Sequence, residues 1–325
     1  MSITNDKRLT QQQLQGLMGF RPLFTVSKIL LFFALLAAVT ALAWHSESEL
    51  VDWTAYAAGG YLWMSIVTFM HEATHNTLFA AKWKNWAFGI VTMIPLMVSF
   101  VAFKEDHLEH HRYNRSPKDP DAFTMGKRGV LDFLAFYAYV LFGALLTFLH
   151  FNLIYPIKYF TPKLWAIHLG EAVLKIACVW ALVAWARQQH MLAAVLEVWL
   201  APVFFFSLLN SMRFLAEHYE TPWDQGKLAG TRTVISNRVH SFFWNNINWH
   251  IGHHLYPRVP AYNLVKLHAL IEPDIAASGA VVDKSYTMVF LNALLRGPES
   301  TQRLDRALSQ RAQRMEAPGN TATLA

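Results

Sequence analysis

The stretch "YLWMSIVTFMHEATH", residues 61–75, carries an apolar run directly into two histidines that stand four residues apart. Its last five letters fit H-E-x-x-H, a pattern typical of zinc metalloproteases, in which the histidines bind the metal and the glutamate is the general base. Taken alone, His71, Glu72 and His75 would predict a protease embedded in a membrane. The composition and the other histidines of the chain test this interpretation.

The composition is that of a membrane protein. Of the 325 residues, 54% are hydrophobic and only 15% are charged, whereas a soluble domain has about 25% charged residues. Several apolar runs approach the roughly 20 residues that a helix needs to cross a bilayer. The net charge of +6 comes from Lys and Arg scattered between these runs, which fits membrane topology and argues against a nucleic-acid partner.

Loop charges predict the orientation of the apolar segments. The connection 45–52 has three acids and no Lys or Arg, and the connection 187–190 has a single Arg. The positive-inside rule therefore places both connections outside, and it places the N-terminus, the segment 104–128 and everything after 213 in the cytoplasm. The candidate membrane segments are 25–44, 53–70, 86–103, 131–155, 164–186 and 192–212.

Not all of these segments can cross. The histidines at 71–75 and those at 107–111 must lie on one side if they share a site, so the segment 86–103, which contains Pro95, is expected to lie in the membrane plane or to re-enter. By the same argument, the segment 131–155 is not counted among the crossings. The predicted fold is an all-α integral membrane protein with about four transmembrane helices, in-plane helices and a cytoplasmic, histidine-rich helical cap that holds a di-metal site.

The predicted organisation is a single membrane domain. It covers residues 25–295, follows a cytoplasmic segment 1–24 and precedes a charged tail 296–325, for which we expect a short helix followed by disorder. Glu171 and Lys175 stand at i, i+4 in one crossing segment, so they are expected to pair.

Two further motifs, "HLEHH" at 107–111 and "HIGHH" at 250–254, share the pattern H-x-x-H-H. Positions i, i+3 and i+4 lie on one side of a helix, so each motif is expected to aim three imidazoles at one point. A mononuclear zinc protease needs three protein ligands and a water, so eight clustered histidines predict two metal ions. Imidazole also binds Cu, Fe and Ni, but a membrane site that faces an apolar substrate favours iron and oxygen activation. A metal transporter or sensor is an alternative, although histidines at the cytoplasmic ends of helices argue against it.

The three motifs, in this order, resemble those of the membrane fatty acid desaturase superfamily, which also contains hydroxylases, ketolases and decarboxylases that form terminal alkenes. The similarity continues in "HLEHHRYNRSPKDPDAF" (107–123) and in "HIGHHLYPRVP" (250–260), which are close to bacterial acyl-lipid desaturases. It covers about 70–290. It also implies one more metal-binding histidine, His218 in "FLAEHYE".

The resemblance implies a specific set of site residues. In the stearoyl-CoA branch an asparagine, which positions a water at one metal, stands where this chain has Phe214. The resemblance leaves two possibilities for the asparagines beside the third motif: they position such a water instead, or they make local capping and turn bonds. These residues are Asn245, Asn246 and Asn248. Glu72, Asp106, Glu109 and Glu217 are expected to hydrogen-bond the metal-binding imidazoles, or else to be ordinary surface carboxylates. The nine implied iron ligands are His71, His75, His107, His110, His111, His218, His250, His253 and His254.

The implied activity is an O2-dependent oxidation by two irons of a long hydrophobic chain, most simply the introduction of a double bond into a fatty acyl chain. Hydroxylation, ketolation and decarboxylation to a terminal alkene are alternatives on the same site, and a zinc metalloprotease is the alternative of another class. Arg232 and Arg238 either hold a polar group of the substrate or have surface roles. The expected location is the bacterial inner membrane, with the site on the cytoplasmic face.

The electrons are expected to come from a separate ferredoxin or cytochrome-type donor, because the sequence shows no haem, flavin or iron–sulfur motif. A set of basic residues on both sides of the second histidine motif either docks this donor or anchors the chain at the membrane surface. These residues are Lys104, Arg112, Arg115, Lys118, Lys127 and Arg128.

Overall fold

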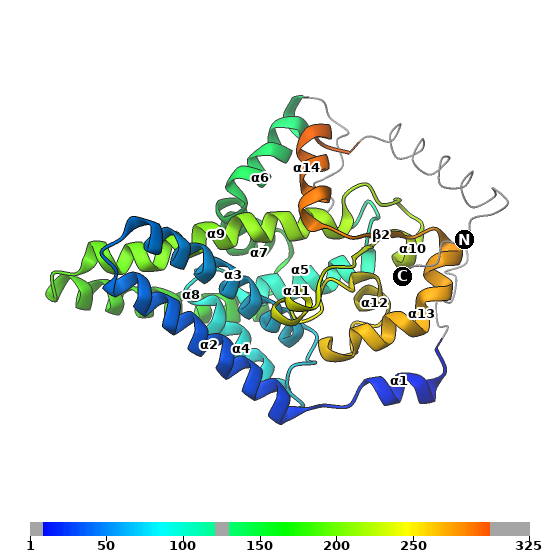
Figure 1. Cartoon of the computed structure of the whole chain (residues 1–325), viewed down its shortest axis with the longest axis horizontal. Helices are drawn as coiled ribbons and strands as arrows, with labels where there is room; N and C mark the ends of the chain where they lie inside the picture. Colours follow the sequence, from blue (N-terminus) through cyan, green and yellow to red (C-terminus); the bar gives the residue numbers. More distant parts are fainter. Residues whose placement is uncertain (1–8, 121–129, 300–325) are drawn as a thin grey trace.

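Long helices dominate the computed structural model, which describes residues 9–120 and 130–299. In Figure 1 the longest helices extend to the left of the view, and shorter helices gather on the right. The helices and strands, in chain order, are α1 (Gln11–Leu17), α2 (Pro22–His45), α3 (Glu49–Thr74), α4 (Lys82–Met93), α5 (Phe100–Tyr113), α6 (Val130–Leu149), η2 (His150–Ile154), α7 (Tyr155–Tyr159), α8 (Pro162–Gln188), α9 (Leu192–His218), α10 (Gly226–Ala229), β1 (Arg232–Val234), α11 (Arg238–Phe243), α12 (His250–Leu255), η3 (Ala261–Asn263), α13 (Leu264–Ser278), β2 (Val281–Asp283) and α14 (Tyr286–Arg296).

Three helices of the described chain, α2, α8 and α9, are long and apolar enough to cross a membrane. They coincide with three of the four predicted crossings. The fourth, 53–70, lies within α3, which has 26 residues but is less apolar. Helix α8 exposes Val173, Ile176 and Trp180, as a helix surrounded by lipid does. Cys178 of the same helix is also exposed.

The two apolar segments that were excluded from the predicted crossings, 86–103 and 131–155, do not form straight membrane-spanning helices. Residues 86–103 are divided between α4 and α5 by a turn in which Met97 has a φ of 55°. The segment 131–155 bends by 103° between Phe133–Val140 and Leu145–Tyr159, so that it is either a broken span or a re-entrant loop. The turn within 86–103 agrees with the expectation that this segment does not cross as one helix. A broken span would still cross, so the exclusion of 131–155 from the crossings stays a prediction.

A close contact between α3 and α9 places the first histidine motif beside the end of α9. A Cβ atom on Gly60 would lie 2.5 Å from Cβ of Phe205 and 2.8 Å from the backbone nitrogen of Phe206. Only glycine allows the two backbones to approach this closely, as small residues do between membrane helices. Near the start of both helices, Tyr56 Oη donates to Glu197 Oε1 at 3.0 Å. The loops before α3 and before α9 therefore lie together, at the end opposite the histidines.

Helix α5, which carries the second motif, is fixed at its start by α8. The carboxylate of Glu171 accepts hydrogen bonds from Ser99 Oγ and from the backbone nitrogens of Phe100 and Val101, at 2.9 to 3.0 Å. An acid at a helix N-terminus satisfies its free N–H groups and interacts favourably with the helix dipole. The expected Glu171–Lys175 pair is replaced by these bonds, and Lys175 Nζ donates to Asn152 instead.

The third motif is held by a cap of short elements. The main apolar core continues from α3 and α5 into this cap through the buried Trp244 and Ile247. Asn245 and Asn246 have positive φ values of 50° and 55°, which asparagine tolerates better than most residues. Strands β1 and β2 pair in parallel with Arg232 opposite Val281, a short sheet that the all-α prediction did not include.

The N-terminal segment packs on this cap. Leu17 of α1 belongs to the same apolar cluster as Leu264 and Ile271 of α13, and Asn263 Nδ2 donates to the carbonyl of Leu17 at 2.7 Å. The start of the chain and the third motif therefore lie at the same end of the molecule, as the topology argument requires. The proposed division into 1–24, 25–295 and 296–325 stays a prediction, and most of the tail lies outside the described residues.

Candidate metal centre

All nine histidines of the predicted set meet in the interior. His71 and His75 come from the end of α3, three from α5, His218 from the last position of α9 and three from α12. Each is at most 8% exposed. They form two adjacent groups, which the sequence spacing did not separate.

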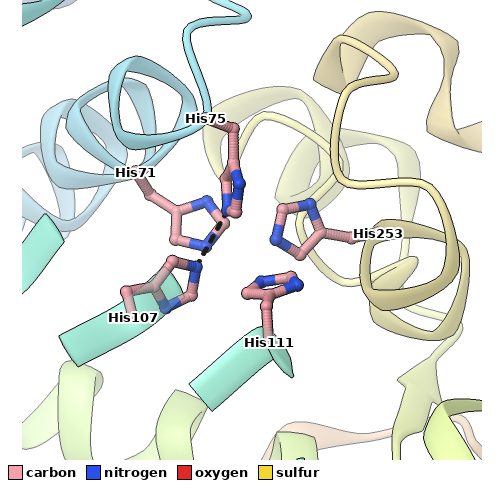
Figure 2. A group of neighbouring side chains, drawn as sticks. All are labelled: His71, His75, His107, His111 and His253. Carbon is pink, nitrogen blue, oxygen red and sulfur yellow. Dashed lines mark hydrogen bonds between the residues drawn. The ribbon is translucent and has the colours of Figure 1, made fainter. Parts of the chain in front are cut away.

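The first group is the five-histidine cluster. Figure 2 shows its rings gathered around one point. One nitrogen from each ring lies within 4.8 Å of the others, and Nε2 of His75 and Nε2 of His107 are 2.9 Å apart. Its members are His71, His75, His107, His111 and His253.

The second group is the four-histidine cluster, which consists of His110, His218, His250 and His254. Ligand nitrogens of His110, His218 and His254 lie within 4.8 Å of one another, and a second, overlapping set contains Glu217, His218 and His250. Nε2 of His110 is 3.1 Å from Nε2 of His218, and Nε2 of His254 is 3.1 Å from Nε2 of His250. The two clusters touch where the rings of His111 and His254 stack at 4.1 Å.

Each H-x-x-H-H motif is divided between the clusters, so the expectation that each aims three imidazoles at one point is wrong. In α5, His107 and His111 join the five-histidine cluster and His110 joins the other. In α12 the division is reversed, because His253 joins the five-histidine cluster while its two neighbours in the motif do not. Consecutive residues differ by about 100° around a helix axis, so adjacent histidines point to different sides.

The four-histidine cluster is surrounded by polar partners. Asp119 Oδ1 contacts Nδ1 of His110 at 2.9 Å, the carbonyl of Gly230 contacts Nδ1 of His218 at 3.1 Å, and Glu217 Oε2 lies 3.3 Å from Nε2 of His250. Partners of this kind fix the tautomer and orientation of a metal-binding imidazole.

The five-histidine cluster has little such support. In the described part of the chain, neither ring nitrogen of His71, His111 or His253 has a hydrogen-bond partner. A buried polar atom without a partner costs about 1–3 kcal/mol. A metal bound through one nitrogen of each ring would satisfy three of these six nitrogens, which fits a metal site. The donor set suits Fe, Zn, Cu or Ni.

The cluster is also kept neutral, which is the form of imidazole that binds metals. Burial, with the positive charge of Lys104 as a second cause, lowers the pKa of His75 to about 3. Burial also lowers the pKa of His107, His111 and His253 well below its usual value, and charges on neighbouring histidines act in the same direction.

Glu72 does not contact an imidazole. Its Oε2 accepts hydrogen bonds from Thr77 Oγ1 at 3.0 Å and from the backbone nitrogen of Ala261 at 2.8 Å. It therefore ties the end of α3 to the loop that follows the third motif. This contact explains the H-E-x-x-H spacing without a general base.

Among the other predicted partners, only Glu217 reaches a clustered histidine. Tyr155 Oη donates to Glu109 at 3.1 Å, Asp106 contacts His150 Nε2 at 2.9 Å, and Asn248 Nδ2 donates to the carbonyl of Val234. Asn245 and Asn246 contact neither cluster, and their side chains do not make the local bonds that were the alternative for them: Asn245 Nδ2 donates to the carbonyl of Ser65 on α3, and Asn246 Nδ2 donates to the carbonyl of Ala261.

The two arginines proposed for the substrate lie elsewhere. Arg232 is buried, with Nη1 donating to the carbonyl of Ala216 and Nε 2.8 Å from Asp283, so it joins α9 to the short sheet. Arg238 is exposed at the start of α11. Of the basic residues considered for donor docking, Lys104 and Arg115 are buried, and Lys127 and Arg128 lie outside the described residues.

A largely apolar cavity of about 310 Å³ reaches both clusters. Arg213 lines this cavity, and its Nε donates to Glu217 Oε1 at 2.7 Å. Its walls come from α5, α6, η2 and α9, and they include Phe103, Leu146, Phe151, Ile154 and Phe214. Neither Arg232 nor Arg238 belongs to this lining.

Sequence reasoning missed three residues of the site, namely Asp119, Arg213 and His150. Asp119 stands in the D-P-D loop that was quoted for the resemblance, and Arg213 stands four residues before Glu217 on an otherwise apolar helix. Asp119 and Arg213 could therefore have been identified as candidates from the sequence. His150 lies outside the three histidine motifs, and only the bend after α6 brings it to Asp106.

Comparison with known proteins agrees with the resemblance drawn from the motifs. A family model described as fatty acid desaturase matches residues 47–286. The chain is 28% identical over 231 residues to the sphingolipid delta(4)-desaturase DES1 of Bos taurus, covering 66% of this chain and 65% of that protein. It is 21% identical over 243 residues to the chloroplastic omega-6 fatty acid desaturase of Glycine max, covering 68% and 55%.

A third relative carries two activities in its name. It is the putative sphingolipid delta(4)-desaturase/C4-monooxygenase of Caenorhabditis elegans, which is 25% identical over 238 residues that cover 66% of this chain and 57% of that protein. In all three cases the match spans less than two thirds of the relative's own length. The family match includes all nine clustered histidines and most of the chain, and it shows that this protein belongs to the fatty acid desaturase family.

Proposed function

We propose that the protein is a di-iron oxidoreductase that uses O2 to introduce a double bond into a lipid chain. The observation that carries the proposal is the apolar cavity, whose walls include histidines of both clusters. A long hydrocarbon fits such walls, and a C–H bond at the inner end of the cavity lies beside both candidate metal sites.

The proposed reaction balances with an external reductant. A –CH2–CH2– unit, O2, two electrons and two protons give –CH=CH– and two waters. When bound, the two irons supply the activation of O2 that removes hydrogen from an unactivated C–H bond. The electrons are proposed to come from a separate ferredoxin or cytochrome-type protein.

The residues of the chain have separate roles in this scheme. The five-histidine cluster is proposed to hold one iron and the four-histidine cluster the other. Phe103, Phe151 and Phe214 line the cavity, where they exclude water and hold the lipid chain in place. Misplacement of the reacting carbon by about 1 Å can cost 100-fold in rate, so these side chains are proposed to set the position of attack.

The alternatives gain less support. Glu72 is engaged by Thr77 and Ala261 and does not line the cavity, which removes the general base that a zinc protease would need. Hydroxylation uses the same site, and the nematode relative is named for both reactions. It is therefore an outcome that the experiment has to separate.

The test is gas chromatography of fatty acids, sphingoid bases, alcohols and hydrocarbons from cells that express wild-type protein or the His253→Ala variant. A new unsaturated lipid chain that appears only with the wild type is expected. A new alcohol or terminal alkene without new unsaturation would replace desaturation by another reaction of the same site. One tightly bound zinc, no iron and no change in lipids would overturn the proposal.

We also propose that both clusters face the cytoplasm of a bacterial cell. The positive-inside rule and the position of the loops before α3 and α9 at the end away from the histidines support it. In a Cys178→Ala background, a cysteine at the exposed Gln188 should react with an impermeant maleimide in intact cells, and one at the exposed Lys266 should react only after lysis. The opposite pattern would contradict this orientation.

A further inference from the structure

The chain returns to the metal centre beyond residue 286, where the family match ends. Residues 294–299, which comprise the last three residues of α14 and the three that follow it, run along the end of α9. We call this segment the C-terminal strap. Tyr137 Oη donates to the carbonyl of Leu294, and Tyr219 Oη donates to the carbonyl of Gly297, each at 2.6 Å. The strap ends in Glu299, which is 1% exposed.

The carboxylate of Glu299 is held by several donors. Nη2 of Arg115 lies 2.8 Å away, Trp223 Nε1 donates at 3.3 Å, and the backbone nitrogen of Glu220 donates to Oε1. The guanidinium of Arg115 also lies 4.0 Å from the centre of the Trp223 ring. Removing one member of a buried ion pair leaves an uncompensated charge and is strongly destabilising locally.

Arg115 stands directly behind two candidate metal ligands. Its backbone nitrogen donates to Asp119 Oδ2 at 2.7 Å, and Asp119 Oδ1 contacts His110 Nδ1. Its guanidinium donates to the carbonyl of Thr221, and Thr221 Oγ1 donates to the carbonyl of His218 at 2.7 Å. Arg115 thus supports, through its backbone nitrogen, the carboxylate that contacts the His110 imidazole and, through its guanidinium, the threonine that contacts the backbone carbonyl of His218. The Nε2 atoms of these two histidines are 3.1 Å apart.

We infer that Glu299 is a positioning residue for the four-histidine cluster, because it fixes Arg115 and, through Arg115, the orientation of His110 and His218. The inference rests on the proposed function, which assigns a metal to each cluster. By this inference, a part of the chain outside the family match supports the metal of the four-histidine cluster and not the metal of the five-histidine cluster.

The strap contains its own control. Arg296 Nη1 contacts Glu220 Oε2 at 2.8 Å, but the Arg296 side chain is 54% exposed. Exposed pairs contribute about 0–1 kcal/mol. Arg296→Gln therefore breaks an ion pair in the same segment without removing the buried carboxylate.

The experiment measures iron retained per chain after full-length protein in detergent is loaded with Fe(II) and challenged with a chelator. Wild type and Arg296→Gln should retain about two irons. Glu299→Gln should retain about one, with a 10–100-fold faster loss from the weakened site. Glu299→Asp, which keeps the charge, should recover part of the retention.

Two further backgrounds show which cluster is affected. In His254→Ala, where the four-histidine cluster is already damaged, Glu299→Gln should change nothing more. In His253→Ala, where the four-histidine cluster holds the remaining iron, it should release that iron. Such non-additivity is expected only for residues that act on one site.

The outcomes separate the two proposals. Wild type with two irons and Glu299→Gln with two equally retained irons would overturn the role of the strap alone. Loss of both irons, or an unfolded Glu299→Gln protein by circular dichroism, would make Glu299 a residue of the general fold and would overturn it as well. Wild type that retains a single metal would overturn the two-metal function itself.

Discussion

The two histidine clusters lie side by side but are supported in different ways. In the four-histidine cluster, Asp119 and the carbonyl of Gly230 contact Nδ1 of His110 and of His218, and Glu217 contacts Nε2 of His250. In the five-histidine cluster, three rings have no hydrogen-bond partner among the described residues, and their positions come from the packing of α3, α5 and α12. The four-histidine cluster is therefore oriented by hydrogen bonds, and the five-histidine cluster by the geometry of the helices that carry it.

Because of this difference, we expect the two clusters to be weakened by different kinds of substitution. Loss of a polar partner should weaken the four-histidine cluster and spare its neighbour, because these hydrogen bonds lead to the imidazoles of the four-histidine cluster alone. A change in helix packing should disturb the five-histidine cluster first, since little else fixes its rings. The four predictions below test this contrast, beginning with the largest effect.

Removing one histidine from each cluster should abolish lipid oxidation in both cases but release different metals. His253 belongs to the five-histidine cluster and His254 to the other. We expect each alanine variant to keep about one iron per chain, and Mössbauer spectra of the two variants should show different remaining sites. Identical spectra, or the loss of both irons from either variant, would mean that the clusters are not separate sites.

Replacing Asp119 with asparagine should weaken iron binding by 10–100-fold at the four-histidine cluster only, because the residue contacts His110 directly. Asp106→Asn is the matched control: that aspartate is equally buried but contacts His150, which is outside both clusters. Chelator-driven release of iron measures the effect. Equal release from both variants would count against an orienting role for Asp119.

A Gly60→Ala substitution should destabilise the protein by about 1–3 kcal/mol, since the added methyl group meets α9 backbone and Phe205 at under 3 Å. The shift of α3 should loosen the five-histidine cluster more than the other. Gly170→Ala in α8 is the control, because its Cβ meets no atom within 4 Å. Thermal unfolding in detergent, with iron retention as the second readout, gives the comparison. A Gly60→Ala protein as stable as the control would show that α3 and α9 have room to separate.

The smallest effect is expected for Glu72→Gln. The amide oxygen can still accept from Ala261 or Thr77, so stability should fall by only about 0.5–1.5 kcal/mol. Iron content and lipid oxidation should remain close to wild type. A variant that keeps its iron but loses all activity would restore a catalytic role for this glutamate.

Much of the site was predictable from short-range pattern. Eight of the nine histidines could be named because metal ligands on helices recur at i, i+3 and i+4, and the family resemblance implied the ninth, His218. Apolar length identified α2, α8 and α9 as spans. The failures share one cause. Glu72, Arg232 and Glu171 have partners that are far away in sequence, and no local spacing reveals such partners.

The sequence by itself determined that this is a helical membrane protein with a histidine-rich centre, because hydrophobic length and ligand type are properties of individual segments. It also carried the family resemblance that the comparison confirmed. Only the tertiary structure decided how each H-x-x-H-H motif is shared between two clusters and which carboxylates stand behind them. That division depends on the rotation of α5 and α12 relative to each other and to the ends of α3 and α9, and such rotations are set by packing between segments distant in the chain.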